Sequence, residues 1–189
     1  MSFVSEREQK LILDLVGQKI TESAFCSTFP LVAGTASTAG LSMLQRALEE
    51  RDAVGVDFGT ILAEQFGLAP EYLQVLADLA SAPWHQRHED IVRELALLKS
   101  PLSIEPLYQA AQARYEYSYD DGAAIARKAV HALGDILTVE SVSRLGDLLR
   151  DRRQIVQNYA RKELTKIAAR EHGPEAVRAE ATRALARET

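Results

Sequence analysis

Hydrophobic residues recur at helical spacing along almost the whole chain. In "SEREQKLILDLVGQK" one apolar stripe is formed by Leu11, Ile12, Leu15 and Val16. Ser5 and Glu8 have the spacing of a capping box. Similar patterns predict helices in "TESAFCSTF", "LSMLQRALEERD", "VDFGTILAEQFGL" and "APEYLQVLADLASA". The Gly-, Ser- and Thr-rich stretch over residues 31–40 predicts a loop. The chain is therefore expected to be all-α.

From residue 84 onward the hydrophobic pattern repeats after 38 positions. The matched pairs are Val92 and Val130, Leu95 and Leu133, Leu98 and Ile136, Ile104 and Val142, Leu107 and Leu145, and Ala111 and Leu149. Each copy has the pattern of a helix, a tight turn and a second helix, and Leu164 and Ile167 belong to a looser third copy. Such a pair must stack on its neighbours to bury both apolar faces. We therefore expect an α-solenoid of two to three helix pairs over residues 84–189, with residues 1–83 as an N-terminal helical segment that caps the stack.

The repeating stretch resembles a known family. "PWHQRHEDIVRELALLKSPLSIEPLYQAA" followed by "YDDGAAIARKAVHALGDI" is similar to HEAT-like repeats of the bacterial bilin-lyase-related (PBS-lyase) type, in which an alanine-rich helix ends in Gly-Asp. The resemblance covers roughly residues 84–170, and the first eighty residues carry no comparable motif. It implies a bacterial protein whose curved stack offers a surface to another macromolecule, usually a protein, in a scaffold or immunity role. Bilin lyases and a class of DNA glycosylases share this fold.

Composition narrows the class of protein further. The chain is 47% apolar and only 6% aromatic, which suits helices packed through small residues. The single cysteine, Cys26, excludes an internal disulfide and a multi-cysteine metal site, and it fits a reducing compartment. The N-terminus lacks the pattern of a secretory signal, and no apolar run reaches the ~18 residues of a membrane span. We expect a cytoplasmic protein that does not contact membranes.

The formal net charge of −5 is unevenly distributed along the chain. Residues 1–140 carry 11 Lys or Arg and 20 Asp or Glu, whereas residues 141–189 carry 11 and 7. An acidic face could meet a basic partner, and solvated helix faces without a partner are the alternative. The excess of acidic residues argues against a dedicated nucleic-acid binder.

Residues 83–95, "PWHQRHEDIVREL", place histidines beside carboxylates. On a helix that starts near Pro83, His85, His88 and Glu89 would lie within one turn, as in a metal site of two histidines and one carboxylate. No ligand from a second element can be assigned, and acidic residues in a first helical turn already offset the helix dipole. We therefore expect no bound metal or cofactor and a core role for His88. The metal site stays open as an alternative.

Two stretches are candidate binding surfaces. The first is "ARYEYSYDDGAAIARK", in which alternating tyrosines and acidic residues precede a helix, and either Asp120 or Asp121 is a natural N-cap. Tyrosine brings a large contact area, so this segment would meet a partner with a basic surface, or else fold back onto the stack as an ordinary inter-repeat loop. The second stretch surrounds Trp84. The candidate binding residues are Tyr115, Glu116, Tyr117, Tyr119, Asp120, Asp121, Trp84, His85 and Arg87.

A basic cluster occupies "LRDRRQIVQNYARK". Its members are Arg150, Arg152, Arg153, Arg161 and Lys162. The cluster could touch phosphate, but aromatic residues that would stack on bases are nearly absent around it. We expect these residues to pair with acidic residues of the neighbouring repeat.

These patterns favour a non-catalytic module that binds another protein through the grooves and inter-repeat loops of its stack. No phosphate-binding loop and no nucleophile elbow occurs in the sequence, and Cys26 lies among apolar residues. A ligand-binding or enzymatic role on the same fold is the alternative. A bilin-lyase-like protein would need an apolar groove lined by aromatic and acidic groups, and a glycosylase would need a basic groove with a pocket for an extruded base. The sequence leaves the oligomeric state open.

Overall fold

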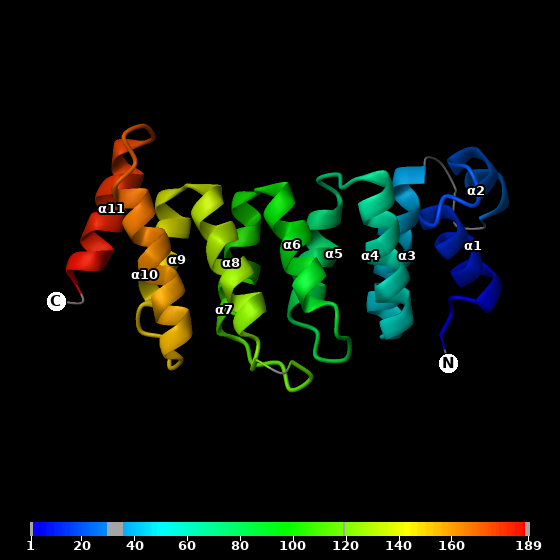
Figure 1. Ribbon diagram of the computed structural model, residues 1–189, viewed down its shortest axis with the longest axis horizontal. Helices are drawn as coiled ribbons and strands as arrows, with labels where there is room; N and C mark the ends of the chain where they lie inside the picture. The colour runs from blue at the N-terminus through cyan, green and yellow to red at the C-terminus, as the bar shows by residue number, and fades with distance from the viewer. Residues whose placement is uncertain (1, 30–35, 119, 188–189) are drawn as a thin grey trace. The chain divides into compact units, whose positions relative to one another are not determined.

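The computed structural model describes residues 2–29, 36–118 and 120–187, and its regular elements are all helical (Figure 1). They are α1 (Glu6–Val16), α2 (Glu22–Thr28), α3 (Ala36–Glu50), α4 (Ala53–Phe66), α5 (Tyr72–Ala80), α6 (His88–Leu98), the 3-10 helix η1 (Pro101–Ser103), α7 (Ile104–Gln112), α8 (Ala123–Ile136), α9 (Val139–Leu148), α10 (Gln154–Ala168) and α11 (Glu175–Ala186). No strand occurs in these described ranges, so the all-α prediction is confirmed.

Contacts within the chain group it into two compact units, Met1–Asp90 and Ile91–Thr189. We call them the N-terminal unit and the C-terminal unit and describe each by itself. The division falls inside α6, a few residues after the boundary between residues 83 and 84 that the sequence pattern predicts. The capping role of residues 1–83 stays a prediction.

Side-chain capping fixes where the first helices begin. Ser5 and Glu8 form the predicted capping box: the Glu8 amide donates to Ser5 Oγ, and the Ser5 amide donates to Glu8 Oε2. Thr21 Oγ1 likewise accepts from the Ala24 amide at the start of α2. Each bond satisfies an N–H group that has no partner within the helix. The apolar side of α1 then packs into the core of this unit through Ile12.

The helix α3 begins earlier than the sequence pattern predicts. Residues 36–40 were expected in a loop but form the first turns of α3, while 31–35 lie outside the described residues. The reason lies in packing between α3 and α4. A Cβ atom at Gly40 would lie only 2.8 Å from the backbone nitrogen of Ala63 and 2.7 Å from the Tyr72 hydroxyl. Glycine therefore serves a close helix–helix approach here and does not mark a turn.

The start of α6 is also different from the prediction. The expected helix from Pro83 is wrong, because α6 begins at His88 and residues 81–87 are not helical. The backbone carbonyls of Leu79 and Ala82 face the ring nitrogens of His85 and His88, each over 2.9 Å. The imidazole groups thus bind one carbonyl in the last turn of α5 and one just after it, and the chain turns before the next helix begins.

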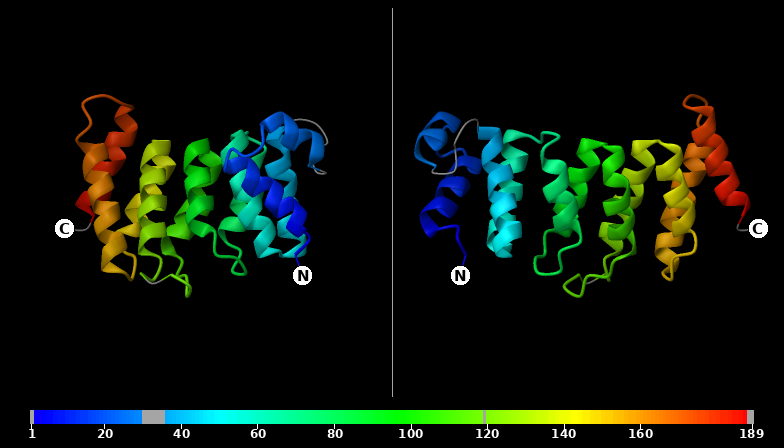
Figure 2. Two further views of the ribbon diagram at one scale, coloured as in Figure 1. Left: turned by 45° about the vertical axis from the view of Figure 1, so that its right-hand side comes forward. Right: turned by 180° about the vertical axis from the view of Figure 1, so that it is seen from behind.

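In the C-terminal unit, the helices from α7 to α11 pack against neighbours in sequence and against the next helix but one. α8 contacts α7, α9 and α10, and α9 contacts α7 and α11. The α7–α8 and α9–α10 connections lie at one end of the helices, and the α8–α9 and α10–α11 connections lie at the other (Figure 1, Figure 2). The contacts are close. A Cβ at Gly134 of α8 would lie 2.6 Å from Glu163 Cγ of α10, and one at Gly146 of α9 would lie 3.0 Å from Ala184 Cβ of α11.

Residues that match at the 38-position offset are buried alike. The pairs with both side chains buried are Val92 and Val130, Leu95 and Leu133, Ile104 and Val142, Leu107 and Leu145, and Ala111 and Leu149. Leu98 and Ile136 are both half-buried, and Leu164 and Ile167 of the looser copy are buried. The repeated hydrophobic pattern therefore corresponds to repeated burial within this unit.

None of the helices within the described ranges has the length and hydrophobicity that crossing a bilayer would require.

Candidate functional site

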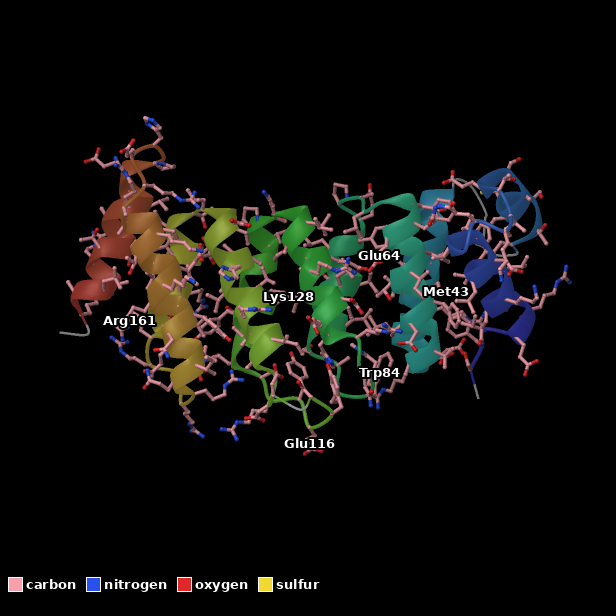
Figure 3. The ribbon with its side chains drawn as sticks, in the orientation of Figure 1. Met43, Glu64, Trp84, Glu116, Lys128 and Arg161 are labelled. Carbon is pink, nitrogen blue, oxygen red and sulfur yellow. The ribbon has the colours of Figure 1, made fainter. Side chains whose placement is uncertain are left out.

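The candidate binding residues of the C-terminal unit lie on the connection between α7 and α8, which we call the 113–122 loop. Tyr115 is buried, and its ring centroid lies 5.8 Å from that of Tyr117, which is 40% exposed. Glu116 is exposed and points away from the helices at the outer end of the loop (Figure 3). Tyr119 lies outside the described residues. The loop thus turns one tyrosine inward and presents Tyr117 and Glu116 to solvent.

Burial sets the acid–base behaviour of the inward tyrosine. Burial and, to a smaller extent, the neighbouring Tyr117 raise the pKa of Tyr115 to about 12, while Arg153 acts in the opposite direction. The phenol therefore stays neutral throughout the physiological range. Tyr115 also packs against Gly122, where an added Cβ would lie 2.8 Å from the tyrosine ring. Because Gly122 has a φ of 80° in the left-handed region, glycine suits this position on both counts.

Asp120 has a structural role at the start of α8. Its carboxylate accepts bonds from Ser118 Oγ at 2.5 Å, from the Gly122 amide at 3.1 Å and from the Ala124 amide at 2.9 Å. The bond from Ser118 contributes most to lowering the pKa of Asp120, and the backbone amides lower it too. The prediction that Asp120 or Asp121 is the N-cap residue of α8 is wrong, because the N-cap is Gly122. Asp120 lies two residues earlier, and its carboxylate still binds the amides of Gly122 and Ala124. Its neighbour Asp121, with a φ of 55°, lies 3.6 Å from Arg114 Nε.

One arginine holds the 113–122 loop against the turn that follows α9. The Arg153 guanidinium donates to the carbonyl oxygens of Ala111, Ala113 at 3.0 Å and Asp121 at 3.3 Å. It also pairs with Asp151 over 3.2 Å, and the two side chains are only 10% and 7% exposed. Carbonyls near the end of a helix lack partners within it, and the planar arginine fork can bind several of them. These bonds therefore hold both ends of the loop, at Ala113 and at Asp121, against the turn that follows α9.

The predicted pairing of the basic cluster with acidic residues of a neighbouring repeat is wrong for three of its members. Arg153 binds mainly carbonyl oxygens, and its carboxylate partner lies in its own turn. Arg150 and Arg152 are exposed and have no ion-pair partner among the described residues. They line an open cleft of about 720 Å³, the arginine cleft, whose residues are Gln112, Arg114, Arg150, Asp151, Arg152 and Arg153. The sequence pattern did not identify Arg114, because nothing local links it to a turn forty residues later.

The remaining predicted residues belong to the N-terminal unit. Arg87 Nε lies 2.7 Å from Asp57 Oδ1 of α4, and its Nη1 lies 3.3 Å from Asp90 Oδ2. The Trp84 ring is half-buried and meets the His85 ring edge to face, with 5.1 Å between centroids. A depression of about 500 Å³ is lined by these side chains. The ion pairs hold the segment before α6 against α4.

His85 and His88 form a buried stacked pair. Their ring centroids are 4.3 Å apart, and each side chain is 2% exposed. Burial lowers the pKa of both histidines; for His88, the charge that His85 would carry lowers it further, to about 4. Each Nε2 faces a backbone carbonyl, so the neutral rings donate from that nitrogen.

The metal alternative gains no support from this arrangement. Nε2 of each histidine is committed to a carbonyl, and Nδ1 of His85 accepts from the Arg87 amide. Glu89 lies on α6 whereas His85 precedes that helix, so the two are not on one helical face. In the part of the chain that the structure describes, no group of three His, Cys, Asp or Glu is arranged to hold a metal ion.

No protein-family model matches the chain, and no curated protein is significantly similar to it. The HEAT-like assignment therefore stays a prediction from the repeated pattern.

Proposed function

We propose that this chain is a non-catalytic helical-repeat module that binds another protein, and that the 113–122 loop is part of the docking surface. The proposal includes a HEAT-like stack for the helix pairs α6 with α7, α8 with α9, and α10 with α11. The shared burial at the 38-position offset supports this stack, as do the contacts of α8 with α10 and of α9 with α11.

The observation that carries the proposal is a solvent-facing loop held in one conformation. Arg153 binds carbonyls at both ends of the loop, and Asp120 binds two amides and a hydroxyl within it. Because these bonds already hold described residues on both sides of position 119, less conformational entropy would be lost when a partner binds. Tyr117 is 40% exposed and offers a large contact area at low entropy cost.

The charge of the docking residues differs from that of a simple acidic patch. Asp120 is committed to amides at the start of α8 and Asp121 lies near Arg114, so Glu116 is the acidic side chain of this loop with the greatest freedom to meet a basic group. We therefore assign the partner contact in this loop to Tyr117 and Glu116. No observation on the described residues favours the lyase-like or glycosylase-like alternatives, which stay predictions.

Site-specific photocrosslinking tests this proposal. A photoreactive amino acid is placed at Glu116 or Tyr117, and at Glu140, an exposed residue of α9, as the matched control. We expect the same discrete protein adduct from an extract of the native host at both loop positions and none at the control. The paired change Glu116→Lys and Tyr117→Ser should abolish adduct formation from a third, exposed position in the loop, Asp121. Equal labelling at the control position would contradict the proposal.

A further inference from the structure

We propose that the arginine cleft is a separate binding site for a short acidic peptide segment with several carboxylates. The inference adds to the proposed function, because it assumes a protein partner. The arginine cleft is a different surface from the loop contact, and it is positively charged where the loop contact is acidic. No residue that is tested below belongs to the contact assigned to Tyr117 and Glu116.

The first argument is local charge. Arg114, Arg150 and Arg152 line the cleft, together with a single carboxylate, Asp151. That carboxylate is 7% exposed and neutralised by Arg153 at 3.2 Å. Like charges gathered on a surface repel one another unless counter-charges are close. Neither Arg150 nor Arg152 has a direct ion-pair partner among the described residues. Asp147 and Glu180, the carboxylates that share a neighbouring depression with Arg150, already pair with Arg144 and Arg183.

The second argument concerns Arg114, which is only weakly paired with Asp121. Arg114 Nε is 3.6 Å from Asp121 Oδ2, and these side chains are 64% and 56% exposed. An exposed ion pair of this kind contributes little free energy, so a ligand carboxylate can replace Asp121 at little cost. α10 also begins at Gln154 with no acidic residue in its first turn, and the positive end of its dipole adds to the field at the cleft.

The third argument concerns which anion fits. All the cationic residues that line the cleft are arginines, whose planar forks bind carboxylates through two parallel bonds. The cleft is open and measures about 720 Å³, far more than a single small anion needs. A long polyanion is disfavoured, since the whole chain carries −5 and Glu116 and Asp121 lie on the adjoining loop. A short segment with carboxylates spaced along an extended backbone satisfies these conditions.

A binding assay with a defined probe tests this inference. The probe is a fluorescent octapeptide of alternating Glu and Gly, and the measurement is its anisotropy at low and at physiological salt. We expect saturable binding that weakens with salt, and a loss of at least tenfold in affinity for Arg150→Glu with Arg152→Glu. The neutral double variant, Arg150→Gln with Arg152→Gln, should have an affinity between those of the wild type and of the Glu double variant.

The matched control carries the same change in charge elsewhere in the C-terminal unit. Lys162→Glu with Arg170→Glu changes α10 about two turns beyond its start and just after its end, ~12 Å or more from the first turn. We expect this control to retain affinity within twofold, with circular dichroism unchanged for every variant. An equal loss in the control would show non-specific attraction and overturn the site. Tighter binding of a single-stranded oligonucleotide of equal charge would overturn the acidic peptide as ligand.

The two proposals fail separately. Loss of peptide binding in the Arg150 and Arg152 variants without loss of the crosslink at Tyr117 would support the cleft alone. Failure of the peptide to bind the wild-type chain would overturn the cleft assignment and leave the loop proposal to its own test.

Discussion

Arg153 donates from Nη1 to the carbonyl oxygen of Ala113 over 3.0 Å, although the two residues are 40 positions apart in the chain. This bond joins the turn after α9 to the end of α7. Asp151 holds the same guanidinium from its other side. The result is a connection between successive helix pairs that also sets the conformation of the 113–122 loop.

Removing this arginine should destabilise the protein. Arg153→Ala removes the counter-charge of the nearly buried Asp151 carboxylate, which keeps its bond from the residue 153 amide, and it removes the guanidinium from the carbonyls of Ala111 and Ala113. Breaking a buried ion pair from one side costs about 3 kcal/mol or more of unfolding free energy. Arg152→Ala is the control, because that side chain is exposed, and a change within ~0.5 kcal/mol is expected. Urea denaturation measures both, and similar values for the two variants would contradict the assignment.

The two aspartates of the loop should differ in their effect on stability. Asp120→Ala removes the bonds to the Gly122 and Ala124 amides and should lower the unfolding free energy by about 1 kcal/mol. Asp121→Asn removes only the distant charge pairing with Arg114, keeps a residue type that tolerates the φ of 55° at this position, and should change the unfolding free energy by less than ~0.5 kcal/mol. Thermal unfolding of the two variants provides the comparison, and the reverse order would show that Asp120 does not stabilise the start of α8.

The buried histidines should make stability depend on pH. Their folded pKa values lie below the ordinary value of 6.5, with His88 at about 4, so the unfolded chain binds more protons between these limits. The contribution of the two histidines to the unfolding free energy is therefore fully present above pH 6.5. It is lost as the pH drops toward 4, and His88 accounts for up to ~3 kcal/mol of this loss. The measurement is urea unfolding at pH 7 and pH 4.5 for the wild type and His88→Asn. The variant should show a smaller difference, and an unchanged difference would mean that His88 is not the group responsible.

Replacing Gly134 of α8 with alanine should destabilise the protein. Alanine is the better helix former by ~1 kcal/mol, but its Cβ would lie 2.6 Å from Glu163 Cγ. Glu163 cannot move away easily, since it is held by His131 Nδ1 at 2.8 Å and Lys166 Nζ at 2.9 Å. We expect a net loss of about 1–3 kcal/mol for Gly134→Ala. In combination with Glu163→Ala the loss should be smaller than the sum of the single losses, and additive effects would exclude the clash.

Local sequence signals predicted much of the fold. The Ser5 and Glu8 pair identified the start of α1, because both partners lie within one helical turn. Positions such as Leu107 and Leu145 are both buried as their repeated spacing implies. Gly40 misled the prediction, since its role is set by Ala63 and Tyr72 on other helices.

The candidate site was less predictable for the same reason. The tyrosines and aspartates marked the 113–122 loop, but nothing in the local pattern shows that Tyr115 turns inward while Tyr117 stays exposed. The bonds of Arg153 join segments 32 to 42 residues apart, and the imidazole of His88 binds a carbonyl six residues earlier. Such contacts depend on tertiary structure, and helical periodicity carries no information about them.

The most direct test of the account is hydrogen exchange of the 113–122 loop in the free protein. The Ser118, Gly122 and Ala124 amides donate to Tyr115 O, Asp120 Oδ1 and Asp120 Oδ2 respectively. We expect these amides to exchange at least ~10-fold more slowly than in an unstructured chain, and Arg153→Ala to remove most of that protection. Exchange at the unstructured rate in the wild type would contradict the claim that this loop is a preformed surface.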